Sequence, residues 1–228
     1  MIDFYYAPTP NGWKVAILLE ELGVEYTTHL MKLGEGDQFK PAFLAISPNA
    51  KMPVIVDQET GTSVFESGAI LWYLAEKAGR FLPDDPALKL EVMQWLFWQV
   101  GNQGPMGGQL SHFVNYAPEG QDYSAKRYRG EYERNLAVLE RRLDGQDWIV
   151  GEYSIADMLA FPWVFIAKPL TSSLEDFPNA KAWRQRIKER PAVMRAINLH
   201  KAKQNRGEQN AQNNKVLYNQ SAAHLLDK

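Results

Sequence analysis

No cysteine occurs anywhere in the 228 residues of this chain. This absence excludes structural disulfides, thiolate metal sites and any catalytic thiol that belongs to the protein itself. If the protein performs thiol chemistry, the reactive thiol must therefore arrive on a ligand. The histidines stand at positions 29, 112, 200 and 224 and lack the spacing of metal ligands, so we expect no metal site.

The chain also lacks a large excess of charge of either sign and lacks long apolar runs. The formal net charge is −2, which gives no reason to expect nucleic acid or an anionic membrane as a partner. No apolar run approaches the roughly 20 residues of a membrane-spanning helix. The N-terminus lacks the basic start and apolar core of a signal peptide, so we expect a cytoplasmic protein. A hydrophobic content of 45% with seven tryptophans predicts folded cores.

The first 79 residues alternate between strand and helix patterns. The expected order is strand, helix, strand, helix, strand, strand, helix, which is the thioredoxin-like layout with a mixed sheet. Residues 7–12 read as a loop, and Gly23 marks the end of the first helix. The predicted strands are 2–6, 26–30, 54–56 and 63–65, and the predicted helices are 15–22, one opening at Pro41 and one after Glu66.

Strand signals nearly vanish after residue 79. Residues 80–87 carry two prolines and two acids and are predicted to be a linker. Helical periodicity then continues through 88–203, with a break expected at 101–108, so this part is predicted to be an all-α domain. Ser154 and Asp157 match a capping box, which gives Asp157 a structural role. The polar extension 204–228 has no apolar periodicity up to residue 215, so 204–215 is predicted to be a mobile connector, although the last part of the extension could pack back onto the body.

Two neighbouring motifs carry the strongest functional signal. Pro53 directly precedes an apolar β-branched run and must start that strand, because proline cannot donate to a sheet ladder. Glu66 and Ser67 then open a helix, whose first turn presents N–H groups that suit an anion. Backbone at a sheet edge pairs with an extended peptide. Together the motifs predict a site for a small peptide with a carboxylate, although each motif alone is also explained by a strand start and a helix cap.

This pattern resembles the glutathione-binding half of the glutathione transferases. The resemblance implies that the proline corresponding to Pro53 is cis and that the backbone of Met52 pairs with the cysteine residue of glutathione. It also implies that Glu66 and Ser67 hold the amine and carboxylate of the γ-glutamyl group. The fold expected by resemblance is the glutathione transferase fold, a thioredoxin-like α/β domain packed on an all-α C-terminal domain with the active cleft between them.

The amino-acid sequence of the loop 7–12 most resembles that of the Nu class, the bacterial disulfide-reducing transferases related to the yeast nitrogen-regulating prion protein. In that class a threonine and an asparagine face the sulfur, which assigns these roles to Thr9 and Asn11. The alternative for both is turn chemistry, because asparagine before glycine favours a left-handed turn. Gln38 matches the residue that contacts the glycine end of glutathione, and Lys51 belongs to the backbone clamp with Met52.

Arg127 matches a position from which the Nu class points an arginine into the site, where it could bind a carboxylate bidentately. Its alternative is an ordinary helical arginine that pairs with Glu131 four residues later. We give the two interpretations equal weight.

By resemblance, we expect a homodimer that reduces small disulfides with glutathione and holds two glutathione molecules or glutathione disulfide in each site. One alternative is conjugation of glutathione to a hydrophobic electrophile, with the aromatic helix at 88–101 lining the acceptor pocket. Another is a module that binds glutathione or a protein without turnover.

Overall fold

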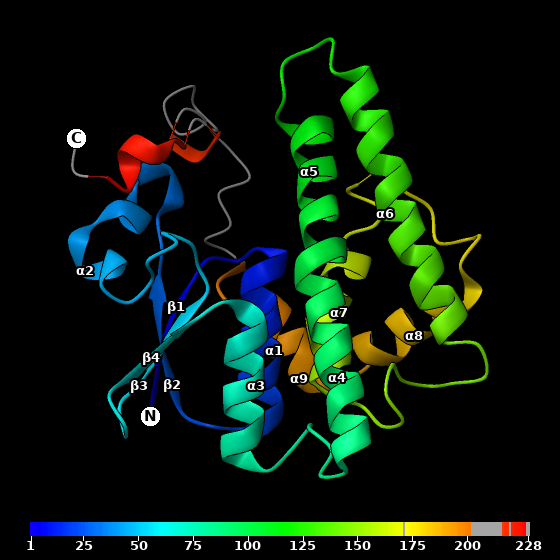
Figure 1. Ribbon diagram of the computed structural model, residues 1–228, viewed down its shortest axis with the longest axis horizontal. Coiled ribbons are helices and arrows are strands. Elements are labelled where there is room, and N and C mark those ends of the chain that lie inside the picture. Colours follow the sequence, from blue (N-terminus) through cyan, green and yellow to red (C-terminus); the bar gives the residue numbers. More distant parts are fainter. Residues whose placement is uncertain (171, 202–215, 219, 227–228) are drawn as a thin grey trace. The chain divides into compact units, whose positions relative to one another are not determined.

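The structure is a computed structural model that describes residues 1–170, 172–201, 216–218 and 220–226. The chain divides into two compact units (Figure 1). The first unit comprises Met1–Ile70 together with the described residues from Arg195 onward, and the second comprises Leu71–Met194. The boundaries predicted from the sequence, with a linker at 80–87, stay a prediction.

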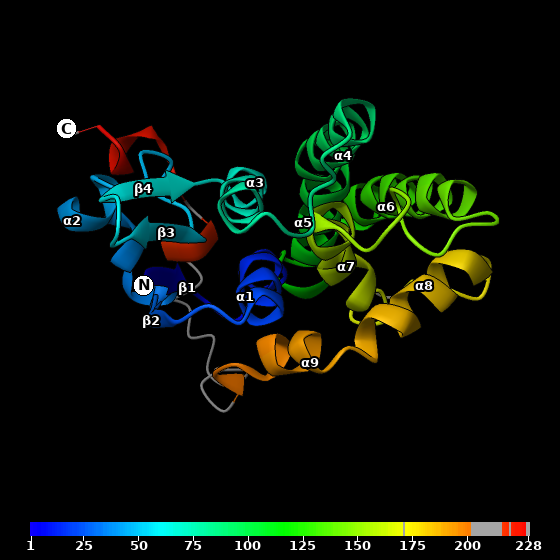
Figure 2. The ribbon, with the colours of Figure 1, turned by 90° about the horizontal axis from the view of Figure 1, so that it is seen from below.

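The first unit is built on a four-stranded mixed sheet in the order β2-β1-β3-β4. β1 is parallel to β2 and antiparallel to β3, and β3 is antiparallel to β4. Helices α1 (Pro10–Leu22) and α2 (Pro41–Leu44) lie on opposite faces of this sheet (Figure 2). The thioredoxin-like order predicted from the sequence is therefore confirmed. The strands are β1 (Ile2–Tyr6), β2 (Tyr26–Leu30), β3 (Val54–Asp57) and β4 (Thr62–Phe65).

Helix α1 (Pro10–Leu22) begins five residues earlier than the predicted start at residue 15. Thr9 is its N-cap, and Pro10 follows at a position where the fixed φ of proline suits the first turn. The prediction of a loop through residue 12 was wrong because these capping signals outweigh the turn preference of Asn-Gly. The end of the helix is confirmed, since Gly23 adopts φ 69° and its N–H donates to the Leu19 carbonyl.

Short helical segments complete the first unit. They include η2 (Asp37–Phe39), α2 (Pro41–Leu44) and, near the C-terminus, η5 (Ala222–His224). The His224 ring lies 4.7 Å from the Phe39 ring, so the last described residues pack against the segment that carries Gln38. The predicted mobile connector 204–215 lies outside the described residues.

The second unit consists of helices. In Figure 1, α5 and α6 run side by side, and α7 lies among its neighbours with every residue from Ile155 to Val164 buried. The predicted break at 101–108 was wrong, because a π-helical segment, η3 (Gln99–Gln103), leads directly into α5, which contains residues 104–108. The α-helices of the second unit are α4 (Pro86–Trp98), α5 (Gly104–Asn115), α6 (Asp122–Arg142), α7 (Ile155–Phe165) and α8 (Pro178–Lys188). Helices α3 (Ser67–Ala78) and α9 (Pro191–Asn198) cross the unit boundaries.

The capping box predicted at the start of α7 is confirmed. Ser154 accepts from the Ala156 N–H, and the fully buried Asp157 accepts from the backbone N–H of Ser154. Asp157 also accepts from the Ile149 N–H and from the Trp183 indole, so it joins three segments of the helical unit. Its role in the structure is therefore in folding. Among the described helices, none is both long and apolar enough to cross a membrane.

Candidate functional site

The segment before β3 has the form expected from the resemblance. The Met52–Pro53 peptide bond is cis. Pairing of β3 begins at Val54, opposite Tyr5 on one side and Phe65 on the other, so the Met52 backbone lies outside the sheet ladder. β3 is an inner strand rather than an edge strand. An extended peptide would therefore pair with the residues that precede it and not with the strand itself.

A buried serine holds this segment in place. Ser47 is fully buried, and its hydroxyl donates to the Lys51 carbonyl at 2.9 Å. The Lys51 side chain is exposed, while Met52 is half-buried and Pro53 is buried. The backbone clamp predicted at Lys51 and Met52 thus has a fixed backbone, which is a precondition for recognising another backbone.

Glu66 and Ser67 stand at the start of α3. Glu66 has a φ of 68°, in the left-handed region that few residues other than glycine adopt, and strain of this kind is common at ligand sites. Its carbonyl accepts from the Ile70 N–H and so belongs to the first helical turn. Asn49 donates from Nδ2 to Glu66 Oε1 at 3.3 Å. This contact joins the Glu66 side chain to the segment that precedes Pro53.

The side chain of Lys14, in α1, contacts Ser67. The lysine is 2% exposed, and its Nζ donates to Ser67 Oγ at 3.4 Å. Burial lowers the pKa of Lys14 to about 7, while the negative charge of Glu66 acts in the opposite direction. The sequence reasoning missed this residue. A single lysine inside the apolar first half of α1 was the available signal.

Thr9 and Asn11 lie at the start of α1. Thr9 Oγ1 accepts from the Gly12 N–H at 3.3 Å and lies 4.0 Å from Met52 Sδ. Thr9 is therefore both the helix cap and a neighbour of the predicted clamp. Asn11 is half-buried in the first helical turn, so the left-handed turn weighed for Asn11 and Gly12 is not formed.

Gly12 lets α1 approach the end of β1 closely. A Cβ atom at this position would lie 2.2 Å from the Ala7 carbonyl oxygen and 2.8 Å from Tyr6 Cδ2. A side chain here would displace the backbone of the loop that carries Thr9. The glycine thus helps to place the N-terminus of α1.

Gln38 is buried, unlike a residue that contacts a bound molecule from an open surface. It is 2% exposed, and its Nε2 donates to the Leu33 carbonyl at 3.2 Å. Its Oε1 is buried and has no hydrogen-bond partner within the described part of the chain. A buried polar atom of this kind calls for a partner.

Arg127 is in the second unit, on the exposed side of α6. Its Nη1 lies 3.3 Å from Glu131 Oε1, the ion pair four residues apart that was the alternative interpretation of this residue. The contact is a surface pair and contributes little to stability.

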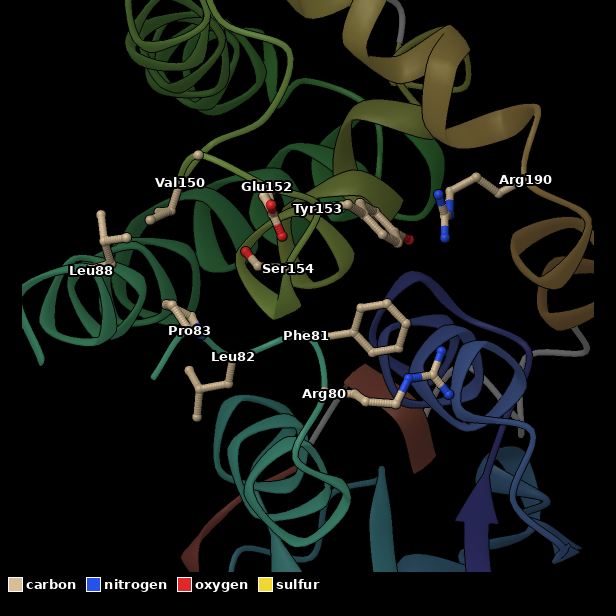
Figure 3. A pocket seen from close by; sticks show the side chains of 11 residues that line it. Arg80, Phe81, Leu82, Pro83, Leu88, Val150, Glu152, Tyr153, Ser154 and Arg190 are labelled. Atoms are coloured by element: carbon tan, nitrogen blue, oxygen red, sulfur yellow. The ribbon is translucent and has the colours of Figure 1, made fainter. Parts of the chain in front are cut away.

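The second unit also contains a cavity of about 490 Å³ (Figure 3). The Arg190 guanidinium lies 3.9 Å from the centre of the Tyr153 ring, and that of Arg80 lies 4.8 Å from the Phe81 ring. No residue that the sequence predicted for the site lines this cavity. Within the described residues, no three acidic or histidine side chains gather as metal ligands.

Comparison with known proteins agrees with this geometry. The model of the glutathione S-transferase N-terminal domain matches residues 2–76, and that of the C-terminal domain matches residues 105–191. The disulfide-bond oxidoreductase YfcG of Escherichia coli is 47% identical over 203 residues, which cover 86% of this chain and 94% of that protein.

Two solved structures extend the comparison. A glutathione transferase from Pseudomonas putida with one glutathione disulfide bound per subunit has a TM-score of 0.81 and 39% identity, covering 87% of this chain and 91% of that one. A glutathione transferase from Burkholderia graminis with two glutathione molecules bound per subunit has a TM-score of 0.80 and 41% identity, covering 90% of this chain and 89% of that one. The resemblance found in the sequence is confirmed, and the chain belongs to the glutathione S-transferase family.

Proposed function

We propose that this protein reduces disulfides with glutathione, without a thiol of its own. One observation carries the proposal: the chain has no cysteine, yet its glutathione-site motifs are linked by direct contacts. Asn49 connects to Glu66, Lys14 to Ser67, and Thr9 lies beside Met52. The name of YfcG and the ligands of the Pseudomonas and Burkholderia structures point to the same chemistry.

In the proposed complex the tripeptide lies along these motifs. Ser67 and the N-terminus of α3 bind the γ-glutamyl carboxylate, and Glu66 binds the amine. The Met52 backbone pairs with the cysteine residue in the manner of an added strand. Gln38 is proposed to contact the glycine end, and Lys51 belongs with Met52 to the backbone clamp.

Thr9 and Asn11 are proposed to act on the sulfur. A free thiol has a pKa of about 8.5, so only a few per cent of it is ionised at neutral pH. Donors from these two side chains and the positive end of α1 favour the thiolate. Each unit by which the pKa falls corresponds to about 1.4 kcal/mol of preference for the anion.

The reaction then needs two glutathione molecules. The thiolate of the first attacks one sulfur of the substrate disulfide, the S–S bond breaks, and the leaving thiolate takes up a proton. The thiolate of the second attacks the glutathione sulfur of the mixed disulfide, which yields glutathione disulfide and releases the second substrate thiol. Two electrons pass from the two glutathione molecules to the substrate, and exchange is fastest when the attacking thiol has a pKa near the ambient pH.

Three further parts of the proposal rest on resemblance. The protein is expected to work as a homodimer, to hold two glutathione molecules or one glutathione disulfide per subunit, and to use Arg127 for a ligand carboxylate. Sedimentation of the purified chain should give twice the 26.0 kDa mass of one copy.

A second candidate function is conjugation of glutathione to a hydrophobic electrophile. Phe97 of α4 is 69% exposed, and Trp95 and Trp98 pack edge to face on the same helix. Exposed aromatic surface of this kind suits an apolar acceptor, although it also suits a contact with a second subunit.

Substrate assays separate these functions. We expect the purified chain to turn over glutathione with a small dialkyl disulfide and to leave an aromatic halide unreacted. The glutathione disulfide that forms is measured in a coupled assay that reduces it. The conjugate is measured by its absorbance. Turnover of the halide alone would favour conjugation, and turnover of neither substrate would favour a binding module.

A further inference from the structure

Lys14 is a buried charged group that the proposed reaction does not use. It lies in α1 among side chains that are almost all buried, including those of Trp13 and Val15. Lysine is rarely buried to this extent in proteins unless it has a partner or a function. Its Nζ donates to Ser67 Oγ, which is itself only 7% exposed.

The contact between the two side chains has a direction. A lysine ammonium has three donors and no acceptor, whereas a serine hydroxyl can both accept and donate. Since Ser67 accepts from Lys14, its own proton is available to an acceptor on another side. A carboxylate placed at the first turn of α3 is such an acceptor.

The charge of Lys14 also favours an anion bound at Ser67. Taking an ammonium group out of water is unfavourable, and burial accordingly lowers the pKa of Lys14 to about 7. Glu66, in the segment that leads into α3, is the charged group whose field opposes this change, and its side chain is exposed to solvent. A ligand anion bound at Ser67 would add negative charge on the buried side and stabilise the charged lysine.

We propose that Lys14 is a positioning residue for the γ-glutamyl end of glutathione. Its ammonium group fixes the Ser67 hydroxyl as a donor and adds positive charge behind the carboxylate that this hydroxyl binds. The inference rests on the proposed function, because it assigns the γ-glutamyl carboxylate to Ser67. It implies that Lys14 acts through Ser67 and that ligand binding and protonation of Lys14 favour each other.

A double-mutant cycle tests the route through Ser67. Lys14→Met, which keeps much of the aliphatic stem, is expected to weaken binding of S-methylglutathione by about ten- to a hundredfold, as is Ser67→Ala. The double variant should bind no more than about threefold weaker than the weaker single variant, because both changes remove one linked interaction. Losses that simply multiply would overturn the route through Ser67.

Lys181→Met serves as the matched control. Lys181 pairs with Glu175 at 2.7 Å in the other unit, and its side chain is 51% exposed. Loss of this charge should leave the dissociation constant within about twofold of the wild type. Thermal melting confirms that each variant is folded, and a folded Lys14→Met variant with unchanged affinity would overturn the inference.

Proton uptake tests the charge argument on the wild-type protein, so it decides the matter even if Lys14→Met does not fold. Calorimetry at pH 7 in buffers of different ionisation enthalpy gives the number of protons taken up. S-methylglutathione is the probe because it has no thiol to ionise, and at pH 7 its amine is already almost fully protonated. Since the pKa of Lys14 is about 7, we expect an uptake of about 0.3 to 0.5 proton per bound molecule. An uptake below about 0.2 proton contradicts the inference.

The same titration separates the two levels of the argument. Absence of any binding by the wild type defeats the proposed function itself. Binding with no uptake, or with equal affinity in a folded Lys14→Met variant, leaves the proposed function intact and defeats only the role of Lys14.

Discussion

Replacement of Asn11 by alanine is expected to slow glutathione-dependent disulfide turnover by about ten- to a thousandfold, the range for loss of one preorganised donor. Asn11 is half-buried in the first turn of α1, and its amide is the donor proposed for a sulfur at the helix N-terminus. The measurement is kcat/KM for a dialkyl disulfide. Affinity for S-methylglutathione should change far less, because the proposed donor acts on the ionised sulfur.

Thr9 needs a more careful comparison because it also caps α1. Thr9→Ala should reduce turnover by a similar factor, but it also removes the acceptor for the Gly12 N–H and costs about 1 kcal/mol of stability. Thr9→Ser keeps the hydroxyl and should retain most of the activity. If both Thr9→Ala and Asn11→Ala turn over disulfide at the wild-type rate, neither residue belongs to the mechanism.

Replacement of Asp157 by alanine is expected to lower the free energy of unfolding by about 3 to 5 kcal/mol. The change leaves three buried donors without their acceptor, namely the N–H groups of Ile149 and Ser154 and the indole of Trp183. The melting temperature should fall by about 10 °C. Affinity for glutathione at 25 °C should be unchanged in the fraction that stays folded.

Asp147→Ala is the control for this variant. Its carboxylate is 72% exposed and pairs with Arg186 at 2.8 Å on the surface of the same unit. Loss of an exposed pair of this kind changes the free energy of unfolding by about 1 kcal/mol or less. Equal losses in the two variants would remove the special role assigned to the buried capping box.

Among the four strands, β1 shows alternating burial of its side chains. In β1 the residues Ile2, Phe4 and Tyr6 are buried, whereas Asp3 and Tyr5 are half-buried. This period of two is visible in the sequence and fixes which side chains enter the core. Tyr6, one of the two tyrosines in the strand, is fully buried, as expected for a strand of this kind.

The start of α1 could not be read from periodicity. Its first turn is Pro-Asn-Gly, which taken locally favours a turn, but the Thr9 cap and Pro10 outweigh this preference, and close contacts hold the first turn in place. Gly12 lies against the Ala7 carbonyl, and Thr9 receives the N–H of Gly12. Neither contact follows from a pattern of apolar residues.

Lys14 was missed for a related reason. A lysine near the start of a helix ordinarily lies in solvent, and the sequence does not say which element covers it. Only the fold brings α1 against the first residue of α3, which places Lys14 beside Ser67. By contrast, the strand start after Pro53 and the helix start at Ser67 were predictable because they follow from the order of the residues, while the roles of Pro53, Glu66 and Ser67 in binding stay predictions.

The most direct test of the proposal is calorimetric titration of the chain with glutathione, glutathione disulfide and cysteinylglycine. We expect saturable heats for both forms of the tripeptide with dissociation constants of about 1 mM or below, and binding of cysteinylglycine at least about tenfold weaker, because it lacks the group assigned to Glu66 and Ser67. Absence of heat from both glutathione and its disulfide, or equal affinity for cysteinylglycine, would contradict the proposed site.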